Sequence, residues 1–569
     1  MKKFVLMLLA VLLMASCTFA AEPIEVYGKH GMVASGHILA SEAGVEIMKQ
    51  GGNAIDAAVA TAFALNVVEG NASGVGGGGF MVIRFAKTGE VIALDYREMA
   101  PQASTKDMFA SQQAKDEEWS AYGGKSVGVP GWLKGMSYAL EKYGTMTLAQ
   151  VAAPAIRYAE EGFVPFPKQI EYINNAFEVL SKYNDPEKIP FFIDGLPLPA
   201  GEKLMQPELG KTIRLIAEKG PDVLYGGEFG EAVVAAANKA GGIMTIDDLK
   251  NYQMYIRKPI EGTYRGYKIY SMPPASSGGT HIVQFLNVME NFDVKKMGHN
   301  SPELLHIIAE TQKMLYADRA KYMADTAFTK VPLIGLANKE YAKTIAARIS
   351  EKPQLEGIEA GDPWPFDGAV RASYQGGLPD SHYSTVHLSV VDEGGNIVAS
   401  TNTINYYFGS GIIVPGYGVL LNDQMDDFAS NPESVNAPEP GKRPLSSMSP
   451  TIVLDPDGKP FLALGAAGAT RIMMAVAQVI MNALDFGMKM SEAIEAPRII
   501  AWRQGDGKAA PLRLCPWIPE QTIEALKQMG YPEFNLVTNA SCNGILFNSE
   551  TGELNGAADS RVVGGAAGY

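Results

Sequence analysis

Helical and strand-like spacings of apolar residues alternate along the chain and predict a protein built from both kinds of element. Residues 36–69 carry apolar side chains at helical spacing, which the pair Gly51-Gly52 interrupts. Because glycine commonly ends a helix, this pattern predicts two helices joined by a glycine turn. Residues 302–327 have the spacing of an amphipathic helix packed on a core. Residues 353–384, rich in Gly, Pro, Asp and Ser, are either a surface loop or a segment that must be cut.

A glycine-rich run at residues 74–79 comes directly before Phe80-Met81-Val82-Ile83-Arg84-Phe85, which predicts a strand. The glycines match GxGxxG, but in a dinucleotide-binding motif the glycines follow a strand and open a helix. The triplet Gly124-Lys125-Ser126 resembles the end of a phosphate-binding loop, yet Trp119 stands where the first glycine of that loop belongs. Neither segment therefore predicts a nucleotide site.

A β-hairpin is predicted in the last third of the chain. Residues 385–391 alternate as a strand, residues 392–396 are turn formers, and residues 397–405 have the pattern of the returning strand. This hairpin places Thr385 opposite Thr403, with both side chains on one face of the sheet. Threonine is common in strands, so the pair alone does not identify a site.

The N-terminus has the order of an export signal, with Met1-Lys2-Lys3 first, then an apolar run, then small residues. The apolar run is too short to span a bilayer comfortably. Removal of residues 1–20 predicts a mature chain that starts at Ala21 and a periplasmic or secreted protein. A lipoprotein cut before Cys17 is the alternative, because Met14-Ala15-Ser16-Cys17 loosely resembles a lipobox.

Composition narrows the classes of function. The chain has 569 residues, 47% of them hydrophobic, which excludes a disordered or fibrous protein. A formal net charge of -14 disfavours nucleic acid or an anionic membrane as a partner. Once Cys17 leaves with the signal, Cys515 and Cys542 remain, and the sequence leaves open whether they pair. The chain has no CxxC motif and seven scattered histidines, which argues against a structural zinc site.

Several short blocks resemble one known family in their order and spacing. The blocks are Gly31-Met32-Val33-Ala34, residues 51–58, residues 74–81, Asp95-Tyr96-Arg97-Glu98-Met99-Ala100-Pro101, residues 127–131, Tyr316-Ala317-Asp318-Arg319, residues 385–405, residues 418–428, residues 442–450, residues 465–470 and Ala558-Asp559-Ser560-Arg561. Together they extend through nearly the whole mature chain, and they resemble the γ-glutamyltranspeptidase family. One such block is weak support, whereas the ordered set is strong.

The resemblance implies an α/β (α+β) protein with the four-layer αββα sandwich of the N-terminal-nucleophile hydrolases. It also implies a precursor that cleaves itself between Ser384 and Thr385, at the end of the polar segment. A large subunit, residues 21–384, and a small subunit, residues 385–569, then form a heterodimer within one interlocked domain. Cleavage frees an α-amino group with an ordinary pKa of about 8, so one threonine supplies both nucleophile and base.

The resemblance further implies a role for each matching residue. Thr385 is the nucleophile, Thr403 orients it, and the backbone N–H groups of Gly468 and Ala469 form the oxyanion hole. The remaining residues hold the donor: Arg97, Ser446 and Ser447 its α-carboxylate, and Asp427, Gln424 and Asn405 its α-ammonium. The implied substrates are glutathione and other γ-glutamyl amides, with water, amino acids or peptides as acceptors. The implied chemistry needs no cofactor and no metal.

Some positions depart from the family pattern. Val386 stands where many members have a second threonine, but the nucleophile is the first of that pair and is present. Ala469 replaces a glycine and is strained if this position requires a positive φ. His387 invites a triad interpretation, but we expect it to pack or hydrogen-bond within its strand. Residues 429–441 are shorter than the loop that covers the donor site in some members, which predicts an open pocket.

Two other classes remain open at the level of sequence. A sibling acylase on the same scaffold would hydrolyse glutaryl or cephalosporin-type amides, whose donors lack the ammonium that Asp427, Gln424 and Asn405 are expected to bind. An exported solute-binding protein for glutamate-like ligands would need no processing junction at Thr385. A serine hydrolase is disfavoured because no histidine stands in a suitable context for a catalytic triad.

Overall fold

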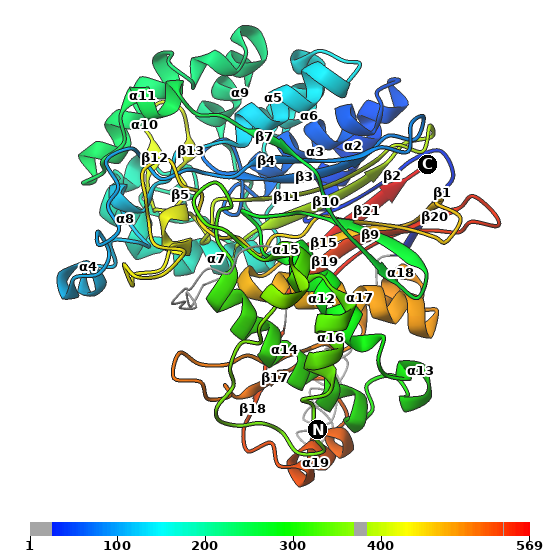
Figure 1. The fold of residues 1–569 in the computed structure, drawn as a ribbon. Helices are drawn as coiled ribbons and strands as arrows, with labels where there is room; N and C mark the ends of the chain where they lie inside the picture. The colour runs from blue at the N-terminus through cyan, green and yellow to red at the C-terminus, as the bar shows by residue number, and fades with distance from the viewer. Residues whose placement is uncertain (1–24, 369–383, 539) are drawn as a thin grey trace, which may run out of the picture.

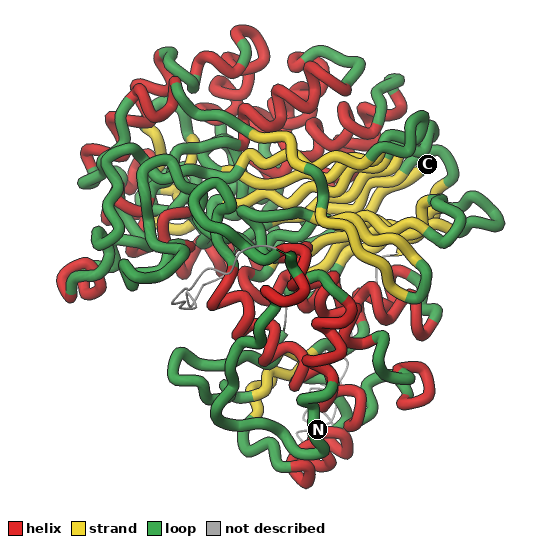
Figure 2. The backbone as a smooth tube through the Cα atoms, viewed as in Figure 1, coloured by secondary structure: helices red, strands yellow, loops and turns green. Residues whose placement is uncertain are grey.

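The computed structural model describes residues 25–368, 384–538 and 540–569. Two seven-stranded antiparallel sheets are stacked face to face, and helices cover the outer face of each (Figures 1 and 2). The strands of the first sheet, in spatial order, are β21 (Gly565–Gly568), β2 (Met32–Ser35), β10 (Val386–Val391), β11 (Ile397–Thr403), β3 (Gly78–Arg84), β4 (Val91–Tyr96) and β7 (Tyr255–Arg257). Those of the second are β1 (Glu25–Gly28), β20 (Leu554–Ala558), β19 (Ser541–Phe547), β15 (Pro460–Ala467), β14 (Thr451–Leu454), β9 (Tyr267–Ser271) and β8 (Ile260–Tyr264).

The two outer layers are helical. Against the first sheet lie α2 (Ile38–Lys49), α3 (Ala54–Val68) and α5 (Trp132–Tyr143), and α6 (Leu148–Glu161) packs on α3. The other helical layer contains α12 (Gly278–Met289), α14 (Pro302–Tyr322), α17 (Ile472–Phe486) and α18 (Met490–Glu495). The expected four-layer αββα sandwich is therefore confirmed.

Shorter elements extend this framework. The remaining α-helices are α4 (Gln112–Asp116), α7 (Pro167–Asn175), α8 (Phe177–Tyr183), α9 (Pro207–Lys219), α10 (Glu228–Lys239), α11 (Ile246–Lys250), α13 (Val294–Met297), α15 (Leu333–Leu336), α16 (Lys339–Ala346) and α19 (Glu520–Met529). Three small sheets join β5 (Phe192–Ile193) to β6 (Leu196–Pro197), β12 (Ile413–Val414) to β13 (Val419–Leu420), and β16 (Ile499–Ile500) to β17 (Leu512–Leu514) and β18 (Phe534–Leu536). Two 3₁₀ helices matter for the site: η5 (Gln424–Asp427) and η6 (Ala469–Arg471).

The strands of the central sheets are buried on both faces. In β3, Met81 and Ile83 belong to the core on the helical side, whereas Phe80 and Val82 belong to the core between the sheets. Alternate residues therefore point to two different apolar layers. This explains why β3 is apolar at successive positions rather than alternately polar, as expected of a strand covered on both sides.

Most predicted elements are confirmed, with two corrections. The two N-terminal helices are α2 and α3, separated by Gly51-Gly52, and the hairpin strands are β10 and β11. The predicted amphipathic helix over 302–327 ends at Tyr322 and is buried almost all round, because α12, α16, α19 and β16 pack on it. The predicted strand at Phe80 begins two residues earlier, at Gly78, where the lack of a side chain lets Tyr96 and Glu98 approach.

The sequence predicts an N-terminal signal and leaves open whether two cysteines pair. The predicted signal, residues 1–20 with Cys17, lies outside the described residues. Within the described residues no helix combines the length and apolar character of a membrane span. Cys515 and Cys542 are buried and are not joined as a disulfide, and burial raises the pKa of the Cys542 thiol to about 11.

Candidate active site around Thr385

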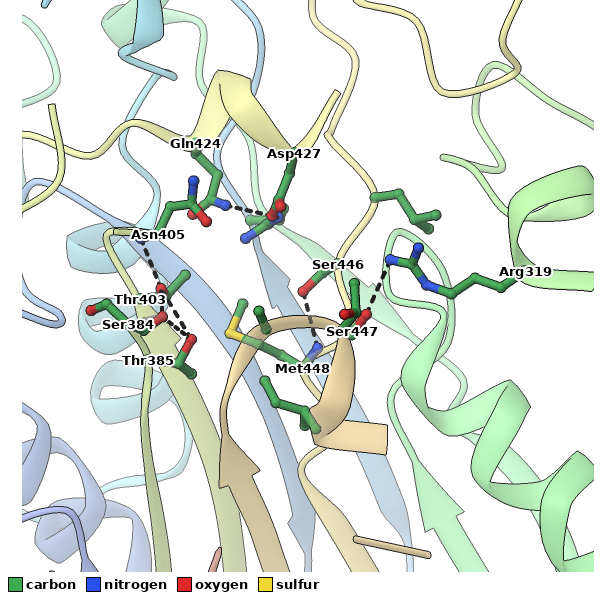
Figure 3. A pocket seen from close by; sticks show the side chains of 15 residues that line it. Arg319, Ser384, Thr385, Thr403, Asn405, Gln424, Asp427, Ser446, Ser447 and Met448 are labelled. Atoms are coloured by element: carbon green, nitrogen blue, oxygen red, sulfur yellow. Dashed lines mark hydrogen bonds and ion pairs between the residues drawn. The ribbon is translucent and has the colours of Figure 1, made fainter. Parts of the chain in front are cut away.

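The paired strands β10 and β11 place two threonines at one end of the first sheet. Val386 pairs with Asn402, so Thr385 lies opposite Thr403, as the hairpin pattern predicts. Both side chains line one cavity (Figure 3). Every predicted site residue except Gly468 lines this cavity. The structure therefore gathers side chains that lie far apart in the sequence.

The Thr403 hydroxyl has a defined hydrogen-bond direction. Its oxygen accepts the Asn405 backbone N–H at 2.8 Å, and its proton is donated to the Ser384 carbonyl oxygen at 3.1 Å. The Thr385 hydroxyl oxygen lies 3.3 Å from the Thr403 hydroxyl and also contacts the Ser384 carbonyl oxygen. The carbonyl oxygen of the Ser384–Thr385 peptide bond thus contacts two hydroxyls, that of Thr385 and that of Thr403 (Figure 3).

His387 is held inside the strand and does not reach Thr385. Its Nδ1 lies 2.8 Å from the Thr401 hydroxyl and its Nε2 lies 3.0 Å from the Ser389 hydroxyl. Burial lowers the pKa of His387 to about 3, so the ring is neutral at physiological pH. The sequence-based expectation of a strand-packing histidine agrees with this geometry.

A small-residue turn, residues 467–469, approaches Thr385 from the second sheet. Gly468 has φ +138°, and a side chain there would meet Ala540 at 2.7 Å, so glycine is required. Ala469 has φ +54°, in the left-handed region that favours glycine. Neither amide N–H donates a hydrogen bond to another described residue. Both are therefore available to an incoming oxygen.

A serine pair and two arginines form the side of the cavity where the sequence predicts the donor carboxylate. Ser446 and Ser447 lie in the extended segment before β14, and Arg97 follows β4 directly. Arg97 is 1% exposed, and its Nε donates to the Pro444 carbonyl oxygen at 3.2 Å. The second arginine, Arg319 of α14, was not assigned a role from the sequence.

Residues of η5 and the segment after β11 form the side where the sequence predicts the donor ammonium. Gln424 donates to the Asp427 carboxylate at 2.7 Å (Figure 3). Arg97 forms a close ion pair with the same carboxylate. Asn405 lines the cavity beside them, and its amide nitrogen lies 3.2 Å from the Asp423 carboxylate. The positive and negative groups expected to bind a donor are therefore paired with each other in the unliganded chain.

Two further buried acids surround this ion pair. Glu98 lies 3.6 Å from the Arg97 guanidinium, and burial raises the pKa of its carboxyl to about 7, although Arg97 acts in the opposite direction. Burial and the neighbouring acid Asp426 also raise the pKa of Asp423 well above its usual range. Both acids are buried near the cavity without lining it, and burial favours the protonated form of each.

A second cavity also reaches Ser384 and Thr385. It is lined by three cations, Lys168, Arg471 and Arg561, and none of the described residues lining it is acidic. Lys168 forms an ion pair with Glu171, and Arg561 forms one with Asp559. The rings of Tyr172 and Tyr407 form a stacked wall, with centroids 3.9 Å apart. Gly468 lines this second cavity, so the small-residue turn separates the two spaces.

The short segment 429–441 stays outside the first of these cavities. None of its residues lines that cavity. Asn436 donates to the Asp427 carbonyl oxygen at 2.7 Å, and Lys442 donates to the Val435 carbonyl oxygen at 2.8 Å. These bonds hold the segment beside η5, and the open pocket stays a prediction.

These features can be set beside known proteins. The family model described as Gamma-glutamyltranspeptidase matches residues 40–569. The chain belongs to this family. The glutathione hydrolase proenzyme of Escherichia coli (strain K12) is 41% identical over 586 residues, which cover 98% of this chain and 97% of that protein. As a member of this family, the chain is an enzyme. The match also agrees with the order of motifs expected from the sequence.

Acylases are also similar to this family member. The acylase ACY 1 proenzyme of Pseudomonas sp. (strain SE83) is 38% identical, over 96% of this chain and 95% of that protein. The crystal structure of a cephalosporin acylase from Bacillus halodurans superposes with a TM-score of 0.86 at 29% identity, covering 97% of this chain and 98% of that chain. The shared fold therefore leaves the choice of donor to the residues of the cavity.

Within this γ-glutamyltranspeptidase family member, sequence reasoning missed Arg319 as a cavity residue and Glu98 as the buried acid beside Arg97. Both belong to blocks that carry the family resemblance, which was the one signal available. The sequence predicts that the helix containing Arg319 is amphipathic. An arginine in such a helix is expected at the surface. Among the described residues no group of three or more His, Cys, Asp or Glu side chains is placed to hold a metal ion.

Proposed function

We propose that this chain is the precursor of a glutathione hydrolase that transfers the γ-glutamyl group of glutathione and related amides to water, amino acids or peptides. The observation that carries this proposal is the Arg97–Asp427 ion pair in the same cavity as Thr385. An α-amino acid head group carries a carboxylate and an ammonium. It can replace both halves of that pair, with its carboxylate on Arg97 and its ammonium on Asp427.

The first step in the proposal is self-cleavage between Ser384 and Thr385. The Thr385 hydroxyl oxygen attacks the Ser384 carbonyl carbon while Thr403 donates to the carbonyl oxygen. The C–N bond breaks, an ester forms, and the freed Thr385 nitrogen takes the hydroxyl proton. Water then hydrolyses the ester and leaves a Ser384 carboxylate and a free Thr385 hydroxyl and amine.

The two products, residues 21–384 and 385–569, are proposed to stay together as a heterodimer. Each central sheet takes strands from both sides of the junction. In the first sheet, β10 of the small subunit pairs with β2 of the large subunit, and β11 pairs with β3. In the second, β14 pairs with β9. Separation would expose two buried sheets, which opposes dissociation.

The cleaved enzyme would then use the same hydroxyl on its donor. The Thr385 oxygen attacks the γ-amide carbon, and the Thr385 amine takes its proton and passes it to the leaving amine. The N–H groups of Gly468 and Ala469 stabilise the oxyanion. The resulting γ-glutamyl ester is released by water or by an acceptor amine. The second cavity, with its cations and tyrosines, would take the leaving group or acceptor.

Donor recognition separates this proposal from its alternative. Asp427, with Gln424 beside it and Asn405 on the same wall, forms an acceptor set that an ammonium fills. A glutaryl donor has no ammonium and would leave the Asp427 carboxylate without that partner. The acylase relatives nevertheless make a glutaryl or cephalosporin-type amidase the second candidate.

The export signal motivates the proposed location. Residues 1–20 have the charged, apolar and small-residue order of a signal peptide, so we place the mature enzyme in the periplasm or outside the cell. Anchoring through a lipid on Cys17 is the alternative. The mass of the large subunit isolated from cell fractions distinguishes Ala21 from a lipid-modified Cys17 as its first residue.

Anilide donors test the function. We expect purified protein to release the anilide from a γ-glutamyl donor at least tenfold faster than from the matched glutaryl donor, which differs only in lacking the ammonium. Equal rates on the two donors would favour the acylase. Inactivity on both, in protein shown to be folded, would contradict both candidates.

A further inference from the structure

Arg319 is a buried cation at the wall of the donor cavity. It is 2% exposed and projects from α14 toward the serine pair (Figure 3). Its Nη2 donates to the Ser447 hydroxyl oxygen at 3.0 Å, and its Nε donates to the Ser277 hydroxyl oxygen at 2.9 Å. Helix α14, in the proposed large subunit, is therefore hydrogen-bonded to a segment of the proposed small subunit.

These contacts set the direction of the Ser447 hydroxyl. A guanidinium only donates hydrogen bonds, so the Ser447 oxygen must be the acceptor. A hydroxyl has one proton, and no described residue accepts the proton of Ser447. Ser277 differs, because it passes its proton to the Ser446 carbonyl oxygen at 2.7 Å. Of the two serines that Arg319 contacts, only Ser447 keeps its proton for a ligand.

The Ser446 hydroxyl is also set as a hydrogen-bond donor toward a ligand. Its hydroxyl oxygen accepts the Met448 backbone N–H at 3.1 Å (Figure 3). Its proton therefore also remains to be donated. Two neighbouring hydroxyls that both face a ligand as donors suit a carboxylate, which only accepts hydrogen bonds. They do not suit an ammonium, which only donates.

The charge balance of the cavity gives Arg319 a second effect. The Arg97 guanidinium is ion-paired with Asp427 and lies 3.6 Å from Glu98. The groups that Arg319 contacts are neutral hydroxyls, and Asp427 acts on it only through space. A guanidinium keeps its proton in proteins, so the buried charge of Arg319 persists. A donor carboxylate at Ser447 would bring the compensating negative charge.

We propose that Arg319 is a positioning residue for the donor's α-carboxylate: it fixes the Ser447 hydroxyl as a hydrogen-bond donor and adds a second positive charge behind it. This inference rests on the proposed function, because it assumes a donor with an α-carboxylate. A purely structural role, tying α14 to residues 446–449, is the competing explanation. The two differ in whether the loss depends on the donor carboxylate.

The test uses two donors and two variants of Arg319. The donors are a γ-glutamyl anilide and the same anilide with its α-carboxylate converted to an uncharged amide. Arg319→Gln removes the charge, and Arg319→Lys keeps it but loses the planar fork that reaches two serines. Arg214→Gln is the matched control, because Arg214 is a half-exposed arginine of α9 that does not line the cavity. Maturation and melting temperature of each variant are checked first.

We expect Arg319→Gln to lower kcat/KM on the free-carboxylate donor about 10- to 100-fold, mainly through KM. On the amidated donor the same variant should change kcat/KM less than about threefold, because the lost charge has no anion to meet. Arg319→Lys should fall between Arg319→Gln and the parent. In a Ser447→Ala background, the effect of Arg319→Lys should largely disappear, because its partner hydroxyl is gone.

Equal losses on both donors would overturn the inference and assign Arg319 to structure alone. If neither Arg319 variant matures, Ser277→Ala replaces them, since it frees the guanidinium on one side without removing it. Failure of all three to mature also overturns the inference. An inactive parent enzyme on every γ-glutamyl donor would instead refute the proposed function, and the inference with it.

Discussion

The Thr385 hydroxyl oxygen lies 3.3 Å from the Thr403 hydroxyl oxygen, and both hydroxyls contact the carbonyl oxygen of Ser384. Thr403 accepts the Asn405 N–H, which leaves its single proton for that carbonyl. The Thr403 side chain is therefore placed to polarise the bond that we propose is cut and, after cleavage, to orient the proposed nucleophile.

Removing the Thr403 hydroxyl should slow self-cleavage. Thr403→Val keeps the volume of the side chain but loses the donor to Ser384, and loss of one oxyanion donor typically costs about 100-fold or more in rate. Thr403→Ser keeps the hydroxyl and should mature. The measurement is the fraction of uncut chain on a denaturing gel with time after synthesis. Maturation of Thr403→Val at the parent rate would show that this hydrogen bond has no role in cleavage.

Breaking the Arg97–Asp427 pair should impair donor binding rather than maturation. Asp427→Ala leaves the buried Arg97 charge without its partner, and Arg97→Ala does the same to the partly buried Asp427. Each also removes one half of the proposed donor site, which costs about 3 kcal/mol or more in kcat/KM. Neither side chain hydrogen-bonds Ser384 or Thr385, so both variants should still appear as two chains. Mature variants with kcat/KM close to that of the parent would contradict the assigned roles.

Glu98 should make stability depend on pH. Burial raises the pKa of its carboxyl from 4.5 to about 7, so the folded state favours the protonated form. Its contribution to stability is therefore complete below pH 4.5 and is lost as the pH rises to 7, by about 3 kcal/mol for such a shift. Glu98→Gln stays uncharged and should lose less melting temperature than the parent between pH 5 and 8. Parallel melting curves for the two proteins across that range would disprove this.

The backbone at Ala469 predicts the effect of two substitutions. Because φ is +54° there, Ala469→Gly should relieve strain and give an enzyme at least as active and about as stable as the parent. Ala469→Val places a β-branched side chain in the left-handed region and should lower kcat by about 100-fold through the displaced oxyanion donor. Comparable kcat values for all three proteins would mean that the turn is not the oxyanion hole.

Local pattern was sufficient for some of these relationships. The position of the turn at residues 392–396 determines the register of β10 and β11, so the pairing of Thr385 with Thr403 followed from the sequence alone. The roles of Arg97, Asp427 and the serine pair needed the family resemblance, because those residues come from separate loops. Their convergence in one cavity depends on the stacking of the two sheets.

Other features could not be read from the sequence. Arg319 and Glu98 are charged residues, which pattern places at the surface, yet both are buried because the layers enclose them. The positive φ of Ala469 and the close approach of Ala540 to the preceding Gly468 are features of the folded turn that no local pattern indicates. Pattern also gave α14 a solvent-exposed face, since periodicity does not show that helices and strands will cover all its sides.

Intact-mass analysis of purified parent and Thr385→Ala proteins tests the central claim most directly. The account predicts that the parent gives two chains, with Thr385 the first residue of the smaller and Tyr569 its last. Thr385→Ala should give one uncut chain without activity on γ-glutamyl anilides. A parent protein that is fully active as a single chain, or a Thr385→Ala variant that is cut and active, would contradict the account.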